Sequence, residues 1–278
     1  MLGLQVTKEL VRRWFISIPA FVLLGLILGG LIAIWVIPKP NVATITISGP
    51  ILGQAYVDDA LDMVNYAREN DSIKAVVLRI DTSGGGASAV EEIYLDVLRL
   101  RQQKPVVVSV GTIAASGGYY VAVASDFIYA EPTSQIGSIG AWVSLPQPEE
   151  LDEDIVTTGP FKATGGSRRK VTGWLEMLRQ DFVEAVMVQR GDRLQLSGEE
   201  LSRAEIYLGT ESLRYGLIDA IGTRTDALEK AADLAHIRNY GVMELEIQKP
   251  VILFFSMEAL KSQTGTTPVY YYLYFESE

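Results

Sequence analysis

The chain has 278 residues with a net charge of −10, one histidine and no cysteine. The lack of cysteine excludes thiolate catalysis, cysteine-ligated metals and disulfide bonds, and His236 alone cannot build a histidine-rich site. A strongly acidic surface repels phosphate backbones, so we expect no nucleic-acid partner.

An uncharged segment of 25 residues runs from Trp14 to Pro38. A helix of roughly 20 apolar residues crosses the hydrocarbon core of a bilayer, so this segment is expected to anchor the chain in membrane lipid. Lys8, Arg12 and Arg13 precede it, and the positive-inside rule then places the amino terminus in the cytoplasm and the rest outside. The predicted localisation is therefore the cell membrane, with a single pass and the main domain extracytoplasmic.

A cleaved signal peptide is the alternative interpretation of this segment. Its apolar region would be about 7–15 residues long and would end in small residues. Here the apolar run is longer and ends in Trp35-Val36-Ile37-Pro38. This pattern favours a retained anchor.

Beyond residue 40, short Val- and Ile-rich runs alternate with amphipathic stretches, which predicts an α/β domain with a largely parallel sheet. The predicted strands are Val42–Ser48, Ala75–Asp81, Pro105–Val110 and Asp126–Ala130. The predicted helices are Val57–Arg68, Ser88–Arg101 (opened by a capping box from Ser88 to Glu91), Trp174–Arg190, Leu201–Leu208 and Thr225–Leu234. Near the end of the chain, Val251–Phe255 and Val269–Phe275 have strand-like composition.

Two glycine-rich turns follow predicted strands, at residues 81–86 and 114–120. Loops at the carboxyl ends of parallel strands are where α/β proteins build their sites. Glycine lets the backbone turn sharply and brings its N–H groups close to a ligand. Ser116, followed by two glycines, therefore has the surroundings of a nucleophile beside an oxyanion hole. For either turn alone, a backbone requirement for glycine is the competing explanation.

Taken in order, these segments resemble the signal peptide peptidases of the SppA type. The stretch Gly111–Ala122 is similar to the nucleophile segment of that family, with Ser116 at the nucleophile, and Gly84 and Gly85 match its oxyanion glycine pair. Farther along, the chain is similar to three more family segments, at Ile136–Gly140, Gly159–Lys162 and Tyr207–Asp219. The resemblance covers about residues 42–223.

The resemblance implies a ClpP/crotonase-like α/β superhelix of β-β-α units. It implies a membrane-anchored serine endopeptidase that degrades remnant signal peptides or small membrane proteins through an acyl-enzyme, with no cofactor and no metal. Ser116 would be the nucleophile and Lys162 the general base, with Ser138 aiming the lysine amine. Gly84, Gly85 and Gly117 would supply the oxyanion amides.

Partners follow from the same resemblance: peptide or protein substrates in extended conformation, and copies of the same chain in a homo-oligomeric ring whose neighbouring subunit can supply the lysine. The implied organisation is a cytoplasmic tail (1–13), an anchor (14–38), a peptidase domain (39–241) and a C-terminal strand-like tail (242–278). The chain departs from the family pattern at Ser83, where a proline is usual, and at Ala163, where an acidic residue often stands.

Several alternatives stay open. A catalytically silent scaffold or chaperone could bind membrane proteins through the same groove, and a crotonase-like enzyme could act on acyl thioesters. Ser167–Lys170 has the S-x-x-K spacing of penicillin-recognising enzymes without their other elements, which leaves Lys170 as the second candidate base. His236 is expected to be a surface or packing residue on a helix.

Overall fold

The computed structural model describes residues 21–29, 39–144, 158–162, 165–246 and 270–273. It divides into two units, residues 1–39 and residues 40–278. In the first unit, residues 21–29 are helical with exposed side chains. Within the described ranges, no helix has both the length and the apolar character needed to cross a membrane. Most of Trp14–Pro38 lies outside those ranges, so the anchor stays a prediction.

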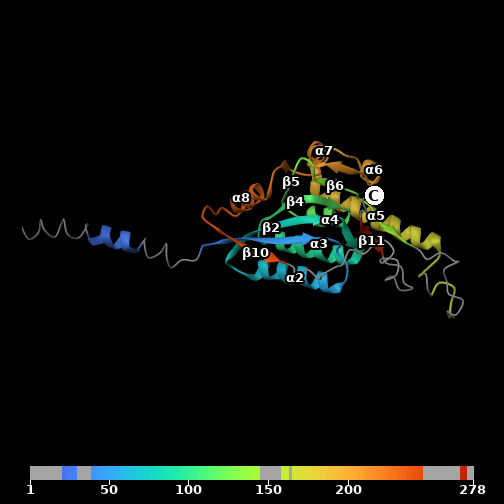
Figure 1. Ribbon diagram of the computed structural model, residues 1–278, viewed down its shortest axis with the longest axis horizontal. Coiled ribbons are helices and arrows are strands. Elements are labelled where there is room, and N and C mark those ends of the chain that lie inside the picture. Colours follow the sequence, from blue (N-terminus) through green and yellow to red (C-terminus); the bar gives the residue numbers. More distant parts are fainter. Residues whose placement is uncertain (1–20, 30–38, 145–157, 163–164, 247–269, 274–278) are drawn as a thin grey trace, which may run out of the picture. The chain divides into compact units, whose positions relative to one another are not determined.

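The second unit is built on one sheet whose central strands are all parallel (Figure 1). The strand order is β10-β1-β2-β4-β5-β9, with β6 beside β4 and β8 antiparallel to β6. Their bounds are β1 Asn41–Ser48, β2 Ile73–Thr82, β4 Val106–Ala115, β5 Phe127–Ala130, β6 Gln135–Gly137, β8 Ile206–Leu208, β9 Ala220–Ile221 and β10 Gly241–Glu246. The prediction of an α/β domain with a largely parallel sheet is confirmed.

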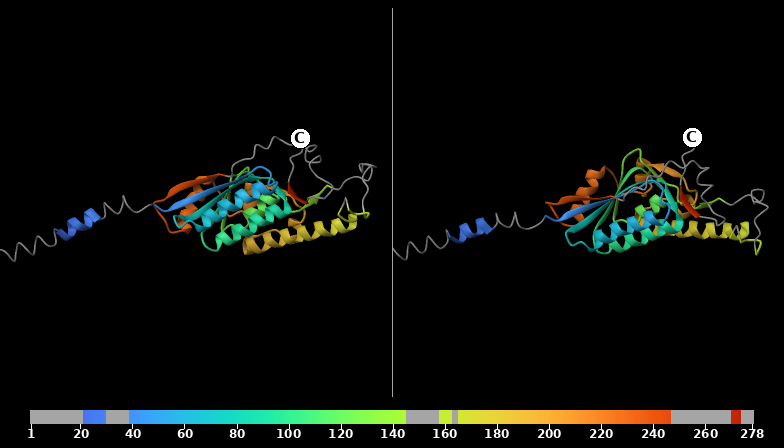
Figure 2. Two further views of the ribbon diagram at one scale, coloured as in Figure 1. Left: turned by 90° about the horizontal axis from the view of Figure 1, so that it is seen from below. Right: turned by 60° about the horizontal axis from the view of Figure 1, so that its bottom comes forward.

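Helices cover both faces of this sheet, which explains why its central strands are almost continuously apolar. Figures 1 and 2 show α2 and α3 on one face and α8 on the other. The helices are α2 Gln54–Glu69, α3 Ala87–Arg101, α4 Gly117–Ala122, α5 Arg168–Arg190, α6 Gly198–Leu201, α7 Gly209–Arg214 and α8 Arg224–Leu234. The larger core lies under α2, α3 and α4, and a smaller one lies under α8.

A second, smaller sheet lies beside the first and has the order β3-β11-β7. Its strands are β3 Gly84–Gly86, β7 Trp142–Val143 and β11 Tyr270–Leu273. Both pairings are antiparallel. The strand predicted over Val269–Phe275 is therefore present in its central part, whereas Val251–Phe255 lies outside the described residues.

Four predictions need correction. Residues 201–208 are not a helix: α6 ends at Leu201 and Ile206–Leu208 forms β8, because β6 supplies a pairing partner far away in sequence. The capping box at Ser88 is absent, because α3 begins one residue earlier and has Gly86 at its N-cap. The strand expected to end at Val110 continues to Ala115. His236 is exposed, as expected, but lies just after α8 with a φ of 57°.

The end of α5 is held by a buried ion pair. Arg190 is 3% exposed, and its guanidinium donates two hydrogen bonds of 2.9 Å to the two carboxylate oxygens of Asp219. The same carboxylate accepts a hydrogen bond from the backbone N–H of Ile128 at 2.8 Å, which ties α5 to β5. Arg193 also donates to Asp219, but its side chain is about half exposed.

Replacing Arg190 by alanine should lower the free energy of unfolding by about 3–5 kcal/mol, because it leaves the Asp219 carboxylate buried without its main partner. The matched control is Arg193→Ala, which removes an exposed partner of the same carboxylate and should cost about 1 kcal/mol or less. Urea unfolding of the two variants checks this. Equal losses would show that the buried pair has no special role.

Candidate active site

Ser116 lies at the sharp turn between β4 and α4. Its backbone has φ 49° and ψ −120°, a conformation that costs a non-glycine residue about 1–3 kcal/mol and that occurs most often at functional sites. All six residues of α4 are buried and the Ser116 N–H donates to the Gly137 carbonyl at 2.8 Å, so the surroundings hold the turn in place. A strained strand–nucleophile–helix turn is how other hydrolases expose a serine hydroxyl.

Ser138 is brought beside Ser116 by the pairing of their strands. β4 and β6 are parallel, with Ala115 opposite Gly137, and each serine is the first residue after its strand. Ser138 also has a positive φ, of 52°, and its N–H donates to the Glu205 carbonyl at 2.9 Å. Two partly or fully buried serines thus meet at the carboxyl ends of neighbouring strands.

The first glycine-rich turn packs directly against this corner. A Cβ on Gly118 would lie 2.5 Å from the Thr82 carbonyl oxygen, and a Cβ on Gly85 would lie 1.9 Å from the Ile51 carbonyl oxygen. Both contacts are with backbone, so only glycine fits at either position. At these two positions the backbone requirement for glycine is confirmed. Gly118 brings the two turns together, and Gly85 brings the first turn against Ile51.

The amides predicted to bind an oxyanion differ in their present partners. The Gly84 N–H donates to the Thr82 hydroxyl at 3.0 Å and so is already occupied. Within the described ranges, the Gly117 N–H has no acceptor. Gly85 lies in the middle of β3, opposite Tyr272 of β11. Among the described residues, Gly117 is therefore the one predicted donor without a partner, and the N–H of Gly85 becomes available only when β11 is displaced.

A hollow of about 510 Å³ adjoins the glycine-rich turn. It lies between the first turns of α2 and α3 and one side chain of α5, and its lining includes Ile51, Leu52, Val57, Ala87 and Leu178. These side chains are mainly apolar. The arrangement offers room for an apolar side chain beside β3.

The predicted base, Lys162, makes no hydrogen bond to Ser116 or Ser138 among the described residues. It is exposed and lies in a turn before α5. Figure 2 shows the N-terminal end of α5 extending beyond the main sheet. The alternative base Lys170 lies on that end of α5, with its ammonium 4.8 Å from the centre of the Trp174 ring. Ser167 caps α5 by accepting from the Lys170 N–H, which gives the S-x-x-K spacing a structural reason.

A family model described as peptidase family S49 matches residues 99–238, about half of the chain. The chain belongs to this family. It is 31% identical over 208 residues to a protein of Methanocaldococcus jannaschii named as a protease. The aligned region covers 70% of this chain and 67% of that protein. It is 28% identical to the chloroplastic serine protease SPPA of Arabidopsis thaliana over 73% of this chain and only 33% of that protein. Among solved structures, a membrane-bound stomatin-specific protease is similar over 77% of this chain, with 20% identity and a TM-score of 0.49.

Membership of S49 identifies the chain as a serine peptidase by family. The matched segment contains Ser116, Ser138 and Lys162, whereas Gly84 and Gly85 precede it. The resemblance inferred from the motifs is thus confirmed at the level of the family. Within the described ranges, no cluster of three or more His, Asp or Glu side chains that could hold a metal occurs.

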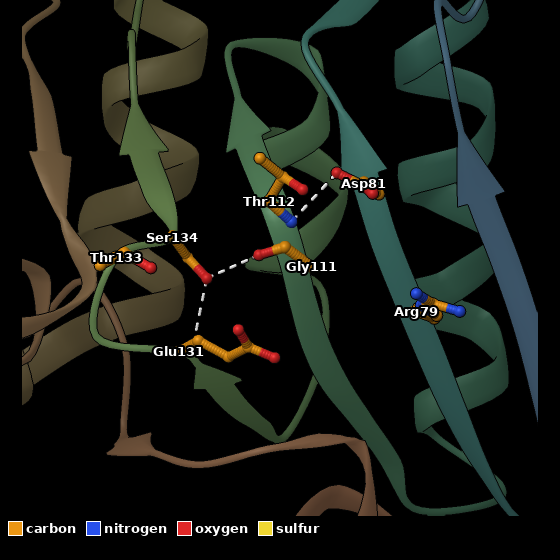
Figure 3. A pocket seen from close by; sticks show the side chains of 7 residues that line it. All are labelled: Arg79, Asp81, Gly111, Thr112, Glu131, Thr133 and Ser134. Carbon is orange, nitrogen blue, oxygen red and sulfur yellow. Dashed lines mark hydrogen bonds between the residues drawn. The ribbon is translucent and has the colours of Figure 1, made fainter.

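Asp81 is a positioning residue of this S49 peptidase that the sequence analysis did not identify. Opposite Asp81, β4 carries extra residues that bulge out of register with β2. The Asp81 carboxylate accepts hydrogen bonds from the N–H groups of Thr112 and Ile113, at 3.1 and 3.2 Å, and so closes the bulge (Figure 3). Ser134 donates to the Gly111 carbonyl at 2.6 Å on the other side. Because Ser116 follows this bulge, both residues help set the position of this candidate nucleophile.

The polar hollow in Figure 3 is the outer side of this bulge. It measures about 220 Å³ and is lined by Asp81, Ser134 and five further residues, including Arg79 and Glu131. The hydrogen bonds that Asp81 and Ser134 make here hold β4 in place. We assign it a supporting role.

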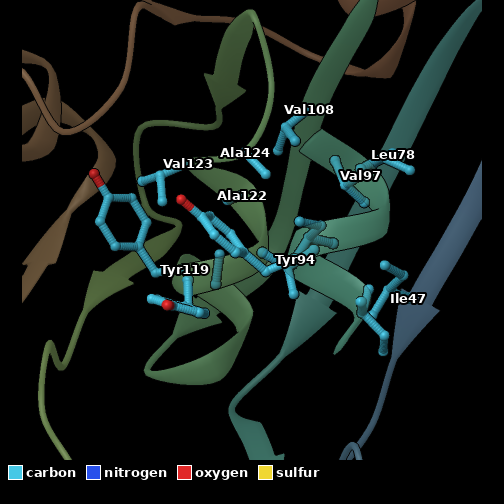
Figure 4. Close-up of a cluster of buried hydrophobic side chains, with 14 of the residues drawn as sticks. Ile47, Leu78, Tyr94, Val97, Val108, Tyr119, Ala122, Val123 and Ala124 are labelled. Carbon is cyan, nitrogen blue, oxygen red and sulfur yellow. The ribbon is translucent and has the colours of Figure 1, made fainter. Parts of the chain in front are cut away.

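Two tyrosines of α4 fix this helix in the core, and Figure 4 shows Tyr119 among the buried side chains. The Tyr119 hydroxyl is fully buried and donates to the Leu217 carbonyl at 2.8 Å, and burial raises its pKa, so it stays protonated as a donor. The Tyr120 ring packs between those of Tyr94 and Phe182, with centroids 4.5 and 4.8 Å away. This rigid support keeps the strained turn at Ser116 from relaxing.

Proposed function

We propose that this chain is a membrane-anchored serine endopeptidase that works through an acyl-enzyme on Ser116. The observation that carries the proposal is the backbone conformation of Ser116, a strained and buried turn followed by the amide of Gly117, which has no acceptor among the described residues. A strain of this kind persists only where the surrounding structure enforces it. Its position at the carboxyl end of β4 is where an α/β sheet presents reactive groups.

In the proposed reaction, the Ser116 hydroxyl attacks the scissile carbonyl while a neutral lysine amine takes its proton. The N–H groups of Gly117 and Gly85 stabilise the oxyanion of the tetrahedral intermediate. Collapse of that intermediate releases the amine product, which leaves with the proton, and forms the acyl ester on Ser116. A water molecule then gives its proton to the lysine and attacks the ester. The lysine returns that proton to the Ser116 oxygen as the acid product leaves.

The proposed base is Lys162 of a neighbouring copy of the chain. Lys162 is exposed and has no hydrogen bond to Ser116 in its own chain, and it precedes a helix that extends past the sheet. A basic run, Arg168-Arg169-Lys170, lies on the same exposed end of α5, whereas the chain as a whole is acidic. These features suit docking against another copy, with Ser138 orienting the incoming amine beside Ser116. A lysine acts as a general base only in its neutral form, and the exclusion of water from a site favours neutral amines.

The proposed substrates are extended peptides at the outer face of the cell membrane, such as remnant signal peptides or small membrane proteins. The uncharged segment Trp14–Pro38 with its flanking basic residues supports the anchor and its orientation. A relative from Enterococcus faecium, 28% identical over 61% of this chain, bears the name signal peptide peptidase, which supports the substrate class. The ClpP/crotonase-type superhelix is proposed as well, supported by the succession β1-α2-β2, β2-β3-α3-β4 and β4-α4-β5 in one parallel sheet.

The test uses four forms of the full-length chain: wild type, Ser116→Ala, Lys162→Ala, and the two variants co-expressed. A fluorophosphonate probe should label wild type and neither single variant, and casein cleavage should follow the same pattern. In the co-expressed mixture, sites that combine Ser116 of one copy with Lys162 of another should restore about a quarter of the wild-type rate.

Each outcome decides one part of the proposal. Labelling that survives Ser116→Ala would refute the nucleophile. A mixture that stays inactive would refute the exchange of lysines between copies and leave a base within the chain. A folded wild type that is never labelled but still binds peptide would make the chain a catalytically silent scaffold.

A further inference from the structure

The small sheet contains a place for one extended peptide. β3 and β7 do not pair with each other. β11 lies between them and pairs with both, with Tyr272 opposite Gly85 and Tyr271 opposite Trp142. Neighbouring strands are about 4.8 Å apart, so without β11 the edges of β3 and β7 would face each other across the width of one strand. Such a gap binds any extended segment that runs antiparallel to both edges.

The backbone groups of Gly85 are directed at this gap. On its other side, β3 is bonded to Ile51, whose N–H donates to the Gly84 carbonyl at 2.8 Å and whose carbonyl accepts from the Gly86 N–H at 3.0 Å. Backbone groups of successive strand residues point to opposite sides, so the N–H and carbonyl of Gly85 face Tyr272. The Gly85 amide cannot serve β11 and a substrate carbonyl at the same time.

β11 also approaches the nucleophile. Leu273 is opposite Gly84, at the end of β3 that follows Thr82, and the Thr82 carbonyl lies against Gly118 at the start of α4. Both α3 and α4 lie against β11. Ser116 itself is only 1% exposed, so it is closed to a substrate in this conformation. A substrate therefore reaches the Ser116 hydroxyl only after something moves.

We propose that residues 270–273 of the chain itself occupy the substrate-binding strand position and keep the peptidase latent. The proposal rests on the proposed function of the same site and adds its regulation. An extended peptide substrate replaces β11 strand for strand, gaining the hydrogen bonds to Gly85 and Trp142 that β11 gives up. Because a tethered segment competes at an effective concentration of the order of millimolar, only substrates held nearby at high local concentration displace it efficiently.

The variant that tests this is Tyr272→Pro in the full-length chain. Proline has no N–H to donate and does not fit a strand paired on both sides, so β11 should leave the gap. Ser277→Pro is the matched control, because it introduces the same residue beyond β11. A chain that ends at Pro268 is the second variant if Tyr272→Pro does not fold. Two readouts are used: the rate of fluorophosphonate labelling at Ser116, and deuterium uptake at the segment that contains Gly85.

The expected result is labelling about tenfold faster or more in Tyr272→Pro than in wild type or Ser277→Pro, with faster exchange at Gly85. A synthetic peptide of residues 268–278 at millimolar concentration should restore the slow rate. Equal labelling rates in all three chains would overturn the proposal while leaving the serine peptidase intact. If no chain is labelled, the proposed function fails, and exchange at Gly85 still decides the occupancy: unchanged uptake in Tyr272→Pro would refute it.

Discussion

Replacing Ser116 by alanine should lower the rate of peptide-bond cleavage by at least about 10⁴-fold, because it removes the nucleophile. The stability of the chain should change little, because within the described residues no hydrogen bond is made by the Ser116 hydroxyl. Alanine also keeps the strained backbone, since its Cβ meets the same crowding at φ 49°.

Ser116→Gly separates strain from chemistry at the same position. Glycine adopts a positive φ without cost, so the free energy of unfolding should be about 1 kcal/mol higher than for Ser116→Ala, although both variants are inactive. Cleavage of a fluorogenic peptide and thermal unfolding are the measurements. Ser88→Ala is the control, because it removes an exposed serine of α3 away from the turn and should leave both measurements unchanged. If glycine does not stabilise the chain relative to alanine, the turn is not strained and the main support for the nucleophile is lost.

Gly85→Ala is expected to give the second largest effect. Its new Cβ would lie 1.9 Å from the Ile51 carbonyl oxygen, and because backbone cannot swing aside, β3 must move. We expect the free energy of unfolding to fall by about 3 kcal/mol. A displacement of about 1 Å at the oxyanion amides should lower kcat about 10²-fold or more.

Gly86→Ala is the matched control for this substitution. The next residue of β3 has ordinary backbone angles, φ −62° and ψ 130°, and a Cβ there would meet only the Ala89 methyl, at 3.9 Å. Its cost should stay within about 1 kcal/mol, the loss expected when alanine replaces glycine at a helix N-cap. Comparable losses in both variants would mean that the closeness of Gly85 to Ile51 does not set the site.

The periodicity of the chain was enough to predict the central layer. Strands such as β2, buried on both faces, appear in the sequence as continuous Val- and Ile-rich runs, and α2 and α8 appear as amphipathic stretches between them. Local chemistry also located the turn at Ser116: a serine before two glycines, after a strand, predicts the tight strand–helix turn that the structure shows. The family membership inferred from these motifs followed from the sequence alone.

Pairings between distant segments could be decided only by the tertiary structure. Residues 206–208 carry no strand signal strong enough to oppose a helix, and they became β8 because β6 offers a free edge about 70 residues earlier. β4 runs past Val110 because the Asp81 carboxylate, from another strand, satisfies the amides of the bulge. β11 pairs with β3 and β7, although both strands are far from it in the sequence. In each case the partner of a backbone N–H or carbonyl decides the structure, and a local pattern of side chains does not specify that partner.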